Sequence, residues 1–126
     1  MVKKVIVIDD EYSISGLLFQ HLSKRGYDVV ALTNGAWITE GLIKTEGVDI
    51  IVTDYHMKIH RFPKGQTRSV MNGDEIIRYL RDNNYRGKIV LSSSVDISSM
   101  KLPQVDAIIE KPFTLDEFTK VIEGLS

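Results

Sequence analysis

The fold of this chain is decided by the stretch Val48-Asp-Ile-Ile-Val-Thr-Asp54. Its aliphatic run, bounded by the turn-prone Gly47 and by Asp54, is typical of a central strand that is covered on both faces. Such a strand carries its last side chain to the edge of the sheet. The sequence therefore predicts that the Asp54 carboxylate serves there as a nucleophile or a metal ligand.

The composition is that of an ordinary soluble globular domain, with 126 residues, 43% hydrophobic and 26% charged residues, and a formal net charge of -1. We expect a single domain over residues 1–126 and no direct nucleic-acid binding. The absence of cysteine excludes a disulfide framework and a thiolate metal site. No apolar run has the length of a membrane span or a signal-peptide core, so we expect a cytoplasmic protein without a membrane partner.

Apolar runs that indicate strands alternate along the chain with helical periodicity. The predicted strands cover residues 5–8, 27–32, 48–54, 88–91 and 107–109. The predicted helices run from an N-cap at Ser13 to a stop at Gly26, over 37–46, from 72 to 84, briefly within 96–105, and from a capping box at 114–117 to 125. This alternation predicts an α/β fold, a three-layer, doubly wound parallel sheet of five strands with helices on both faces.

A long basic loop follows Asp54. Residues 55–71 show no sustained periodicity and carry four basic residues with no acid: Lys58, Arg61, Lys64 and Arg68. Loops of this length are uncommon in compact domains. Two interpretations stay open: a solvated insertion, or a functional cover that raises the affinity of an acidic pocket for phosphate or docks an acidic partner.

A polar side chain follows each of four predicted strands. Asp9 and Asp10 follow the first, Asp54 ends the third, Ser92 follows the fourth and Lys111 follows the fifth. In doubly wound folds these carboxyl ends surround one site. Three clustered carboxylates stay ionised only beside a cation, and Mg²⁺ is the natural cofactor because it takes oxygen ligands. Asp54 would then attack a phosphoryl group, while Lys111 and Ser92 contact its oxygens.

Five motifs in this order make the chain similar, over essentially its full length, to the receiver domain of two-component response regulators. They are Val-Ile-Val-Ile-Asp-Asp-Glu at 5–11, Asp-Ile-Ile-Val-Thr-Asp at 49–54 with Met57, Met-Asn-Gly at 71–73, Leu-Ser-Ser at 91–93 and Lys-Pro-Phe at 111–113. The resemblance implies the flavodoxin-like strand order 2-1-3-4-5.

The resemblance also implies a role for each residue of the site. It implies Asp54 as phosphoacceptor, Lys111 as phosphate contact, Ser92 as switch hydroxyl, and Asp9, Asp10, Asp54 and the main-chain carbonyl of His56 as ligands of Mg²⁺. A histidine kinase or phosphotransfer protein would donate the phosphoryl group, and an unknown output protein would read it through phosphorylation-dependent contacts. The domain would be no enzyme beyond its own phosphorylation and dephosphorylation. Lys111-Pro112 would be a cis peptide.

Three departures from the family surround these motifs. Lys58 stands where the family has proline, and Gly73 comes 19 positions after Asp54, an insertion of about 11 residues that extends the loop after the third strand. Ile108 replaces the usual aromatic switch residue. The segment from Ser92 to Lys111 is short, which predicts a shortened fourth helix.

Two alternative functions remain open. The departures motivate a pseudo-receiver, in which the same fold serves as an unphosphorylated interaction or dimerisation module, although the intact acids and Lys111 argue against it. A small phosphohydrolase with Asp54 as nucleophile is the other, although such enzymes typically place a second acid where this chain has His56.

Overall fold

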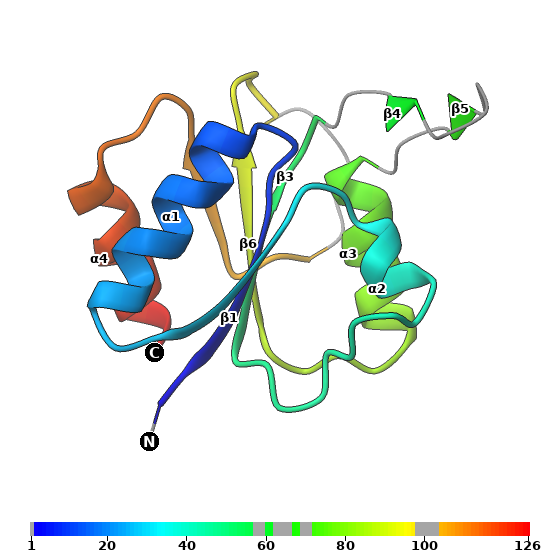
Figure 1. The fold of residues 1–126 in the computed structure, drawn as a ribbon, viewed down its shortest axis with the longest axis horizontal. Coiled ribbons are helices and arrows are strands. Elements are labelled where there is room, and N and C mark those ends of the chain that lie inside the picture. The colour runs from blue at the N-terminus through cyan, green and yellow to red at the C-terminus, as the bar shows by residue number, and fades with distance from the viewer. Residues whose placement is uncertain (1, 57–59, 62–66, 69–71, 98–103) are drawn as a thin grey trace.

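The computed structural model describes residues 2–56, 60–61, 67–68, 72–97 and 104–126. They form three layers, with a parallel sheet in the middle, α1 and α4 on one face, and α2 and α3 on the other (Figure 1). The elements are β1 (Lys4–Ile8), α1 (Tyr12–Lys24), β2 (Asp28–Leu32), α2 (Ala36–Thr39), β3 (Ile50–Asp54), β4 (His60–Arg61), β5 (Thr67–Arg68), α3 (Gly73–Asp82), β6 (Lys88–Ser93), β7 (Ala107–Glu110) and α4 (Leu115–Leu125).

The sheet has five strands in the order β2-β1-β3-β6-β7, and every neighbouring pair is parallel. Since β6 and β7 are the fourth and fifth strands of this sheet, the predicted order 2-1-3-4-5 is confirmed. The strand β3 lies at its centre, between β1 and β6, and all its residues are buried. The predicted central strand therefore delivers Asp54 to the carboxyl edge.

Alternate residues of β3 point into two separate cores. Ile51 packs with α3 residues such as Ile77 on one face, whereas Ile50 and Val52 pack with α1 and α4 on the other face. A strand with apolar contacts on both faces needs an unbroken aliphatic run. The sequence pattern of this strand thus follows directly from its place in the middle layer.

The first and last helices begin at different kinds of cap. In α1 the N–H groups of Ile14 and Ser15 donate to the carbonyl oxygen of Glu11, so the N-cap is Glu11 and the predicted cap at Ser13 is wrong. In α4 the Thr114 hydroxyl accepts a hydrogen bond from the N–H of Glu117 at 3.0 Å, as the capping box predicted. In the described ranges, no helix is both long and apolar enough to cross a membrane.

The helix predicted over 37–46 is wrong beyond its first turn. The helix α2 ends at Thr39, and Gly41 adopts a positive φ of 76°. A glycine in this left-handed conformation terminates a helix without the strain that a side chain would cause. The second helical element is therefore one turn, which leaves Trp37 and Leu42 exposed.

The extended loop after β3 contains a regular element that the sequence did not predict. The two-residue strands β4 and β5 pair antiparallel, His60 with Arg68 and Arg61 with Thr67, and form a sheet of their own. The loop positions 57–59, 62–66 and 69–71 lie outside the described residues. The shortened helix predicted within 96–105 also falls mainly outside them, on 98–103.

Candidate functional site

Three carboxylates meet at the carboxyl edge of the sheet. Asp9 and Asp10 follow β1, Asp54 ends β3, and one oxygen of each lies within 4.8 Å of the others. Asp9 and Asp54 are only 3% and 7% exposed, while Asp10 is partly exposed. The structure thus brings together the three acids that the sequence singled out, in a place where water screens them poorly.

The Lys111 ammonium group lies between two of these acids. Its Nζ donates to Oδ2 of Asp9 at 2.7 Å and lies 3.4 Å from Oδ1 of Asp54. The other oxygen of Asp9 accepts a hydrogen bond from the N–H of Glu11 at 3.0 Å. Burial lowers the pKa of Lys111, but the hydrogen bonds and charges of Asp9 and Asp54 together outweigh burial and raise it overall. The lysine is therefore charged and held in the pocket.

Lys111 is positioned by the neighbouring strand β6. Its N–H donates to the carbonyl oxygen of Ser93 at 2.7 Å, which continues the β6–β7 pairing beyond Glu110. The bond from Lys111 to Pro112 is cis, as the resemblance implied.

The Asp54 carboxyl holds its proton more tightly than an ordinary aspartate. Burial raises its pKa from 3.8 to about 6, the charge of Lys111 opposes this rise, and the charges of Asp9 and Asp10 add to it. A cation bound among the three acids would favour the ionised, nucleophilic form.

Two adjacent serines at the end of β6 differ in their hydrogen bonding. Ser92 pairs in register with Asp54, and its Oγ is buried without a hydrogen-bond partner among the described residues. Ser93 instead donates its hydroxyl to the carbonyl oxygen of Val95 at 3.0 Å and accepts from the N–H of Val95 at 3.1 Å. Only the Ser92 hydroxyl is therefore available to a ligand, which favours Ser92 over Ser93 for the predicted role.

Gly73, which the sequence pattern placed only at the start of a helix, also closes the base of the insertion. Its N–H donates to the carbonyl oxygen of Tyr55 at 2.8 Å, and a Cβ at this position would come within 2.5 Å of the Asp54 carbonyl oxygen. The motif Asn72-Gly73 was the signal for a close backbone approach.

The predicted metal ligands include the main-chain carbonyl of His56, which stays a prediction. The His56 side chain is exposed, and its ring meets the Tyr55 ring edge-on with centroids 4.8 Å apart. The three carboxylates are oxygen donors of the kind that Mg²⁺ prefers, and the partnerless Ser92 hydroxyl lies at the neighbouring strand end. The donor set therefore fits Mg²⁺ together with an anionic ligand.

This arrangement of residues occurs in a chain that matches a known protein family. The family described as the response regulator receiver domain matches residues 5–123. This chain is a member of that family. Receiver domains are signalling modules of two-component systems, and they bind Mg²⁺ at an acidic pocket of the kind formed by Asp9, Asp10 and Asp54.

The receiver domain also resembles individual proteins. It is 30% identical over 131 residues to the alkaline phosphatase synthesis transcriptional regulatory protein PhoP of Bacillus subtilis (strain 168), an alignment that covers 99% of this chain and 49% of that protein. The chain therefore spans about half the length of this curated relative.

Solved structures share the fold at lower sequence identity. Chemotaxis response regulator CheY4 of Vibrio cholerae has a TM-score of 0.78 at 19% identity, with 100% of both chains covered. Response regulator TrrA of Thermotoga maritima, solved in complex with Mg²⁺-BeF, has a TM-score of 0.77 at 24% identity and covers 99% of this chain and 100% of its own. These matches support the flavodoxin-like architecture.

One departure from the family is visible at the edge of the sheet. Ile108 on β7, which stands at the aromatic switch position, is 48% exposed. Because residue 108 is isoleucine, no aromatic ring at this position can follow the state of Ser92.

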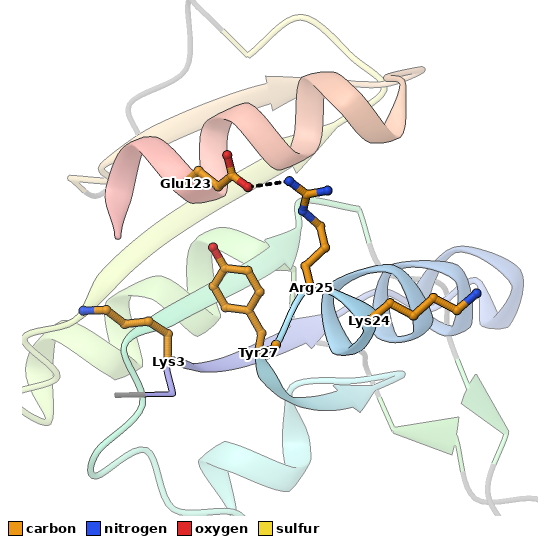
Figure 2. A pocket seen from close by; sticks show the side chains of 6 residues that line it. Lys3, Lys24, Arg25, Tyr27 and Glu123 are labelled. Atoms are coloured by element: carbon orange, nitrogen blue, oxygen red, sulfur yellow. Dashed lines mark hydrogen bonds and ion pairs between the residues drawn. The ribbon is translucent and has the colours of Figure 1, made fainter.

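A second hollow lies at the opposite end of the sheet, with a volume of about 470 Å³ (Figure 2). It is lined by Lys3, Lys24, Arg25, Gly26, Tyr27 and Glu123. Arg25 forms an ion pair with Glu123 at 2.7 Å, which ties the end of α1 to α4, and the Lys3 and Lys24 side chains point away from each other. Because the charges of Lys3 and Lys24 do not converge, this arrangement does not form a second anion site among the described residues.

Proposed function

We propose that this receiver domain is a phosphorylation-dependent switch in which Asp54 accepts a phosphoryl group from a histidine kinase or phosphotransfer protein. The proposal covers the chain from residue 1 to 126 as one receiver unit. An output protein would then distinguish the phosphorylated from the unphosphorylated form by direct contact. Family membership supports the class of donor and the cytoplasmic setting that such donors require.

The proposed step is a displacement at phosphorus. A carboxylate oxygen of Asp54 forms a bond to the phosphorus atom, the bond from phosphorus to the donor histidine nitrogen breaks, and its electron pair stays on that nitrogen. Such a transfer depends mainly on positioning and on charge stabilisation. Lys111, 3.4 Å from Oδ1 of Asp54, would neutralise one phosphoryl oxygen, and the Ser92 hydroxyl would donate to another.

Mg²⁺ would be held by Asp9, Asp10, Asp54 and the main-chain carbonyl of His56. When bound, it supplies positive charge that keeps the acids ionised and neutralises phosphoryl oxygens. Asp9 shares its two oxygens between the Glu11 N–H and the Lys111 ammonium, so its orientation is set before any ligand binds.

The observation that carries the proposal is the Ser92 hydroxyl beside Asp54, which has no hydrogen-bond partner in the part of the chain that the structure describes. A buried hydroxyl without a partner costs free energy, about 1–3 kcal/mol. Its retention next to a carboxylate cluster and a buried lysine is explained by a ligand that carries oxygen acceptors. A phosphoryl group on Asp54 provides those acceptors.

The test is to incubate the protein with Mg²⁺ and acetyl phosphate and to follow its intact mass and the release of phosphate. We expect a mass gain of one phosphoryl group that is absent in Asp54→Asn and after chelation of Mg²⁺. Asp28→Asn is a matched control, because Asp28 is an exposed residue at the opposite end of the sheet.

Two other outcomes would support the alternatives. Absence of a mass gain with acetyl phosphate, phosphoramidate and phosphorylated histidine kinases would favour a pseudo-receiver. Continuous release of phosphate with many turnovers, lost in Asp54→Asn, would favour a phosphohydrolase.

A further inference from the structure

The buried hydroxyl of Thr53 has no part in the proposed phosphoryl transfer. Thr53 directly precedes Asp54 in β3, and its side chain is 0% exposed. Its hydroxyl donates a hydrogen bond to the main-chain carbonyl oxygen of Asp54 at 3.1 Å. A polar group that is buried this deeply normally has a partner, and here the partner is the backbone of the proposed nucleophile. The contact therefore acts on the peptide unit that follows Asp54.

Thr53 and the Asp54 carboxylate lie on opposite faces of β3, because successive side chains of a strand alternate. Thr53 shares the face of Ile51, which packs with α3. Asp54 shares the face of Val52, which packs with α1 and α4. The threonine thus contacts the main chain of the nucleophile and leaves its carboxylate to the ligands on the other face.

The Asp54 carbonyl also lies against Gly73 at the start of α3. A Cβ at position 73 would come within 2.5 Å of this carbonyl oxygen, so only a glycine lets the helix approach so closely. The N–H of the same peptide unit belongs to Tyr55 and donates to the Ser92 carbonyl oxygen at 2.8 Å. Both ends of the peptide unit are therefore held, the C=O by Thr53 and Gly73 and the N–H by Ser92.

The orientation of this peptide unit affects where the chain after Asp54 runs. Two residues further on is His56, whose main-chain carbonyl is one of the ligands that the proposed function assigns to Mg²⁺. A main-chain carbonyl has no side-chain torsion with which to adjust to a metal, so its position depends on the backbone angles that follow Asp54. Because Mg²⁺ demands near-ideal octahedral geometry, a rotation of this peptide unit would weaken its binding.

We propose that Thr53 is a positioning residue for Mg²⁺ binding, whose hydroxyl holds the peptide unit between Asp54 and Tyr55 in the orientation that the metal site requires. The proposal rests on the proposed function, which places Mg²⁺ beside Asp54. Without the hydroxyl this peptide unit has more freedom, and metal binding must then restrict it, which lowers the affinity. The effect falls on Mg²⁺ binding and on the Mg²⁺ concentration that phosphorylation requires.

The test compares two substitutions of Thr53 that separate its hydroxyl from its methyl group. Thr53→Val replaces the hydroxyl by a methyl group, whereas Thr53→Ser keeps the hydroxyl and loses the methyl group. Thr119→Val is the matched control, because Thr119 is also buried and its hydroxyl donates to the Leu115 carbonyl oxygen at 2.7 Å within α4. Isothermal titration measures the Mg²⁺ affinity of each unphosphorylated protein, and urea unfolding measures its stability. Intact mass gives the rate of phosphorylation by acetyl phosphate over a range of Mg²⁺ concentrations.

We expect Thr53→Val to bind Mg²⁺ about three- to tenfold more weakly than the unaltered chain, the range set by the loss of one neutral hydrogen bond. Its phosphorylation should need a correspondingly higher Mg²⁺ concentration for the half-maximal rate, whereas the maximal rate stays within about twofold. Thr53→Ser and Thr119→Val should bind Mg²⁺ within about twofold of the unaltered chain, even where they are less stable. The affinity would then follow the hydroxyl of Thr53 and not the stability of the fold.

Equal Mg²⁺ affinity of Thr53→Val and the unaltered chain would overturn this proposal and leave the proposed function intact. An equal loss of affinity in Thr53→Ser or in Thr119→Val would also overturn it, because Thr53 would then only support the fold. If the unaltered chain binds Mg²⁺ but accepts no phosphoryl group, the proposed function fails, and the titration still decides the role of Thr53. If the unaltered chain binds no Mg²⁺, both proposals fail.

Discussion

Gly73 and Tyr55 are in direct backbone contact, with the Gly73 N–H 2.8 Å from the Tyr55 carbonyl oxygen. A Cβ on residue 73 would come within 2.5 Å of the Asp54 carbonyl oxygen and 2.9 Å of the Tyr55 Cα. Gly73→Ala must therefore displace the end of β3. We expect it to lower the free energy of unfolding by about 1–3 kcal/mol, measured by urea unfolding, and to slow phosphorylation of Asp54.

Gly16→Ala is the matched control, because a Cβ on this α1 glycine would meet no described atom within 4 Å apart from its chain neighbours and the nearby backbone of its own helix. Within a helix this change should stabilise the fold by up to about 1 kcal/mol. If Gly73→Ala is as stable as the unaltered chain, the first residues of α3 can shift without loss of stability, which would contradict this prediction.

The pKa of Asp54 makes the stability of the metal-free domain depend on pH. Burial raises this pKa from 3.8 to about 6, so the folded state binds the proton more tightly than the unfolded state does. The resulting stabilisation is present below pH 3.8 and is lost as the pH rises through 6. Asp54→Asn removes this dependence. In EDTA, the free energy of unfolding of Asp54→Asn minus that of the unaltered chain should therefore rise by about 2 kcal/mol from pH 4 to pH 7.

Urea unfolding of both proteins across this pH range measures the difference, with Asp28→Asn as an exposed control. If this difference in the free energy of unfolding falls with rising pH, the ion pair with Lys111 lowers the Asp54 pKa more than burial raises it. Saturating Mg²⁺ should remove or reverse the advantage of Asp54→Asn, because the metal stabilises the ionised carboxylate.

Lys111 compensates the buried charge of Asp9, to which its ammonium donates at 2.7 Å. Lys111→Met leaves Asp9 and Asp54 without this cation. We expect the free energy of unfolding in EDTA at neutral pH to fall by about 3 kcal/mol, since removing one partner of a buried pair leaves an uncompensated charge. Mg²⁺ should then raise the thermal midpoint of this variant more than that of the unaltered chain.

The control for this prediction is Lys120→Met, at an exposed position of α4. It should change neither the stability nor the response to Mg²⁺. If Mg²⁺ stabilises Lys111→Met and the unaltered chain equally, the lysine and the metal do not share the carboxylates.

Alanine substitutions of Ser92 and Ser93 should have different effects, one on phosphorylation and the other on stability. Ser92→Ala removes a hydroxyl that has no partner among the residues described by the structure. Its stability should therefore stay the same or rise slightly, while the yield or lifetime of the phosphorylated form falls. Ser93→Ala removes two hydrogen bonds with Val95 and should cost about 1–2 kcal/mol with little change in phosphorylation. Intact mass and urea unfolding measure the two effects. If Ser93→Ala instead lowers phosphorylation while Ser92→Ala lowers stability, Ser93 is the phosphate contact.

Strands were easier to predict from the sequence than the second helix or the insertion. The aliphatic runs of β1 and β3 are long enough to indicate burial on both faces. In the second helix the helical periodicity continued past Gly41, but α2 ends at Thr39 and Gly41 has a positive φ. The β4 and β5 strands have two residues each, which is too short for any periodicity to appear.

The sequence by itself determined which chemical groups lie at the strand ends, because a parallel sheet collects its carboxyl ends at one edge. Tertiary structure alone decided how these groups interact. Lys111 contacts Asp9 more closely than Asp54, Ser92 lacks the partner that Ser93 has, and the Gly73 backbone touches that of Tyr55. These contacts join residues far apart in the chain, or depend on how the backbone turns after β6. Their distances follow from how the whole sheet and its helices pack, which no local pattern contains.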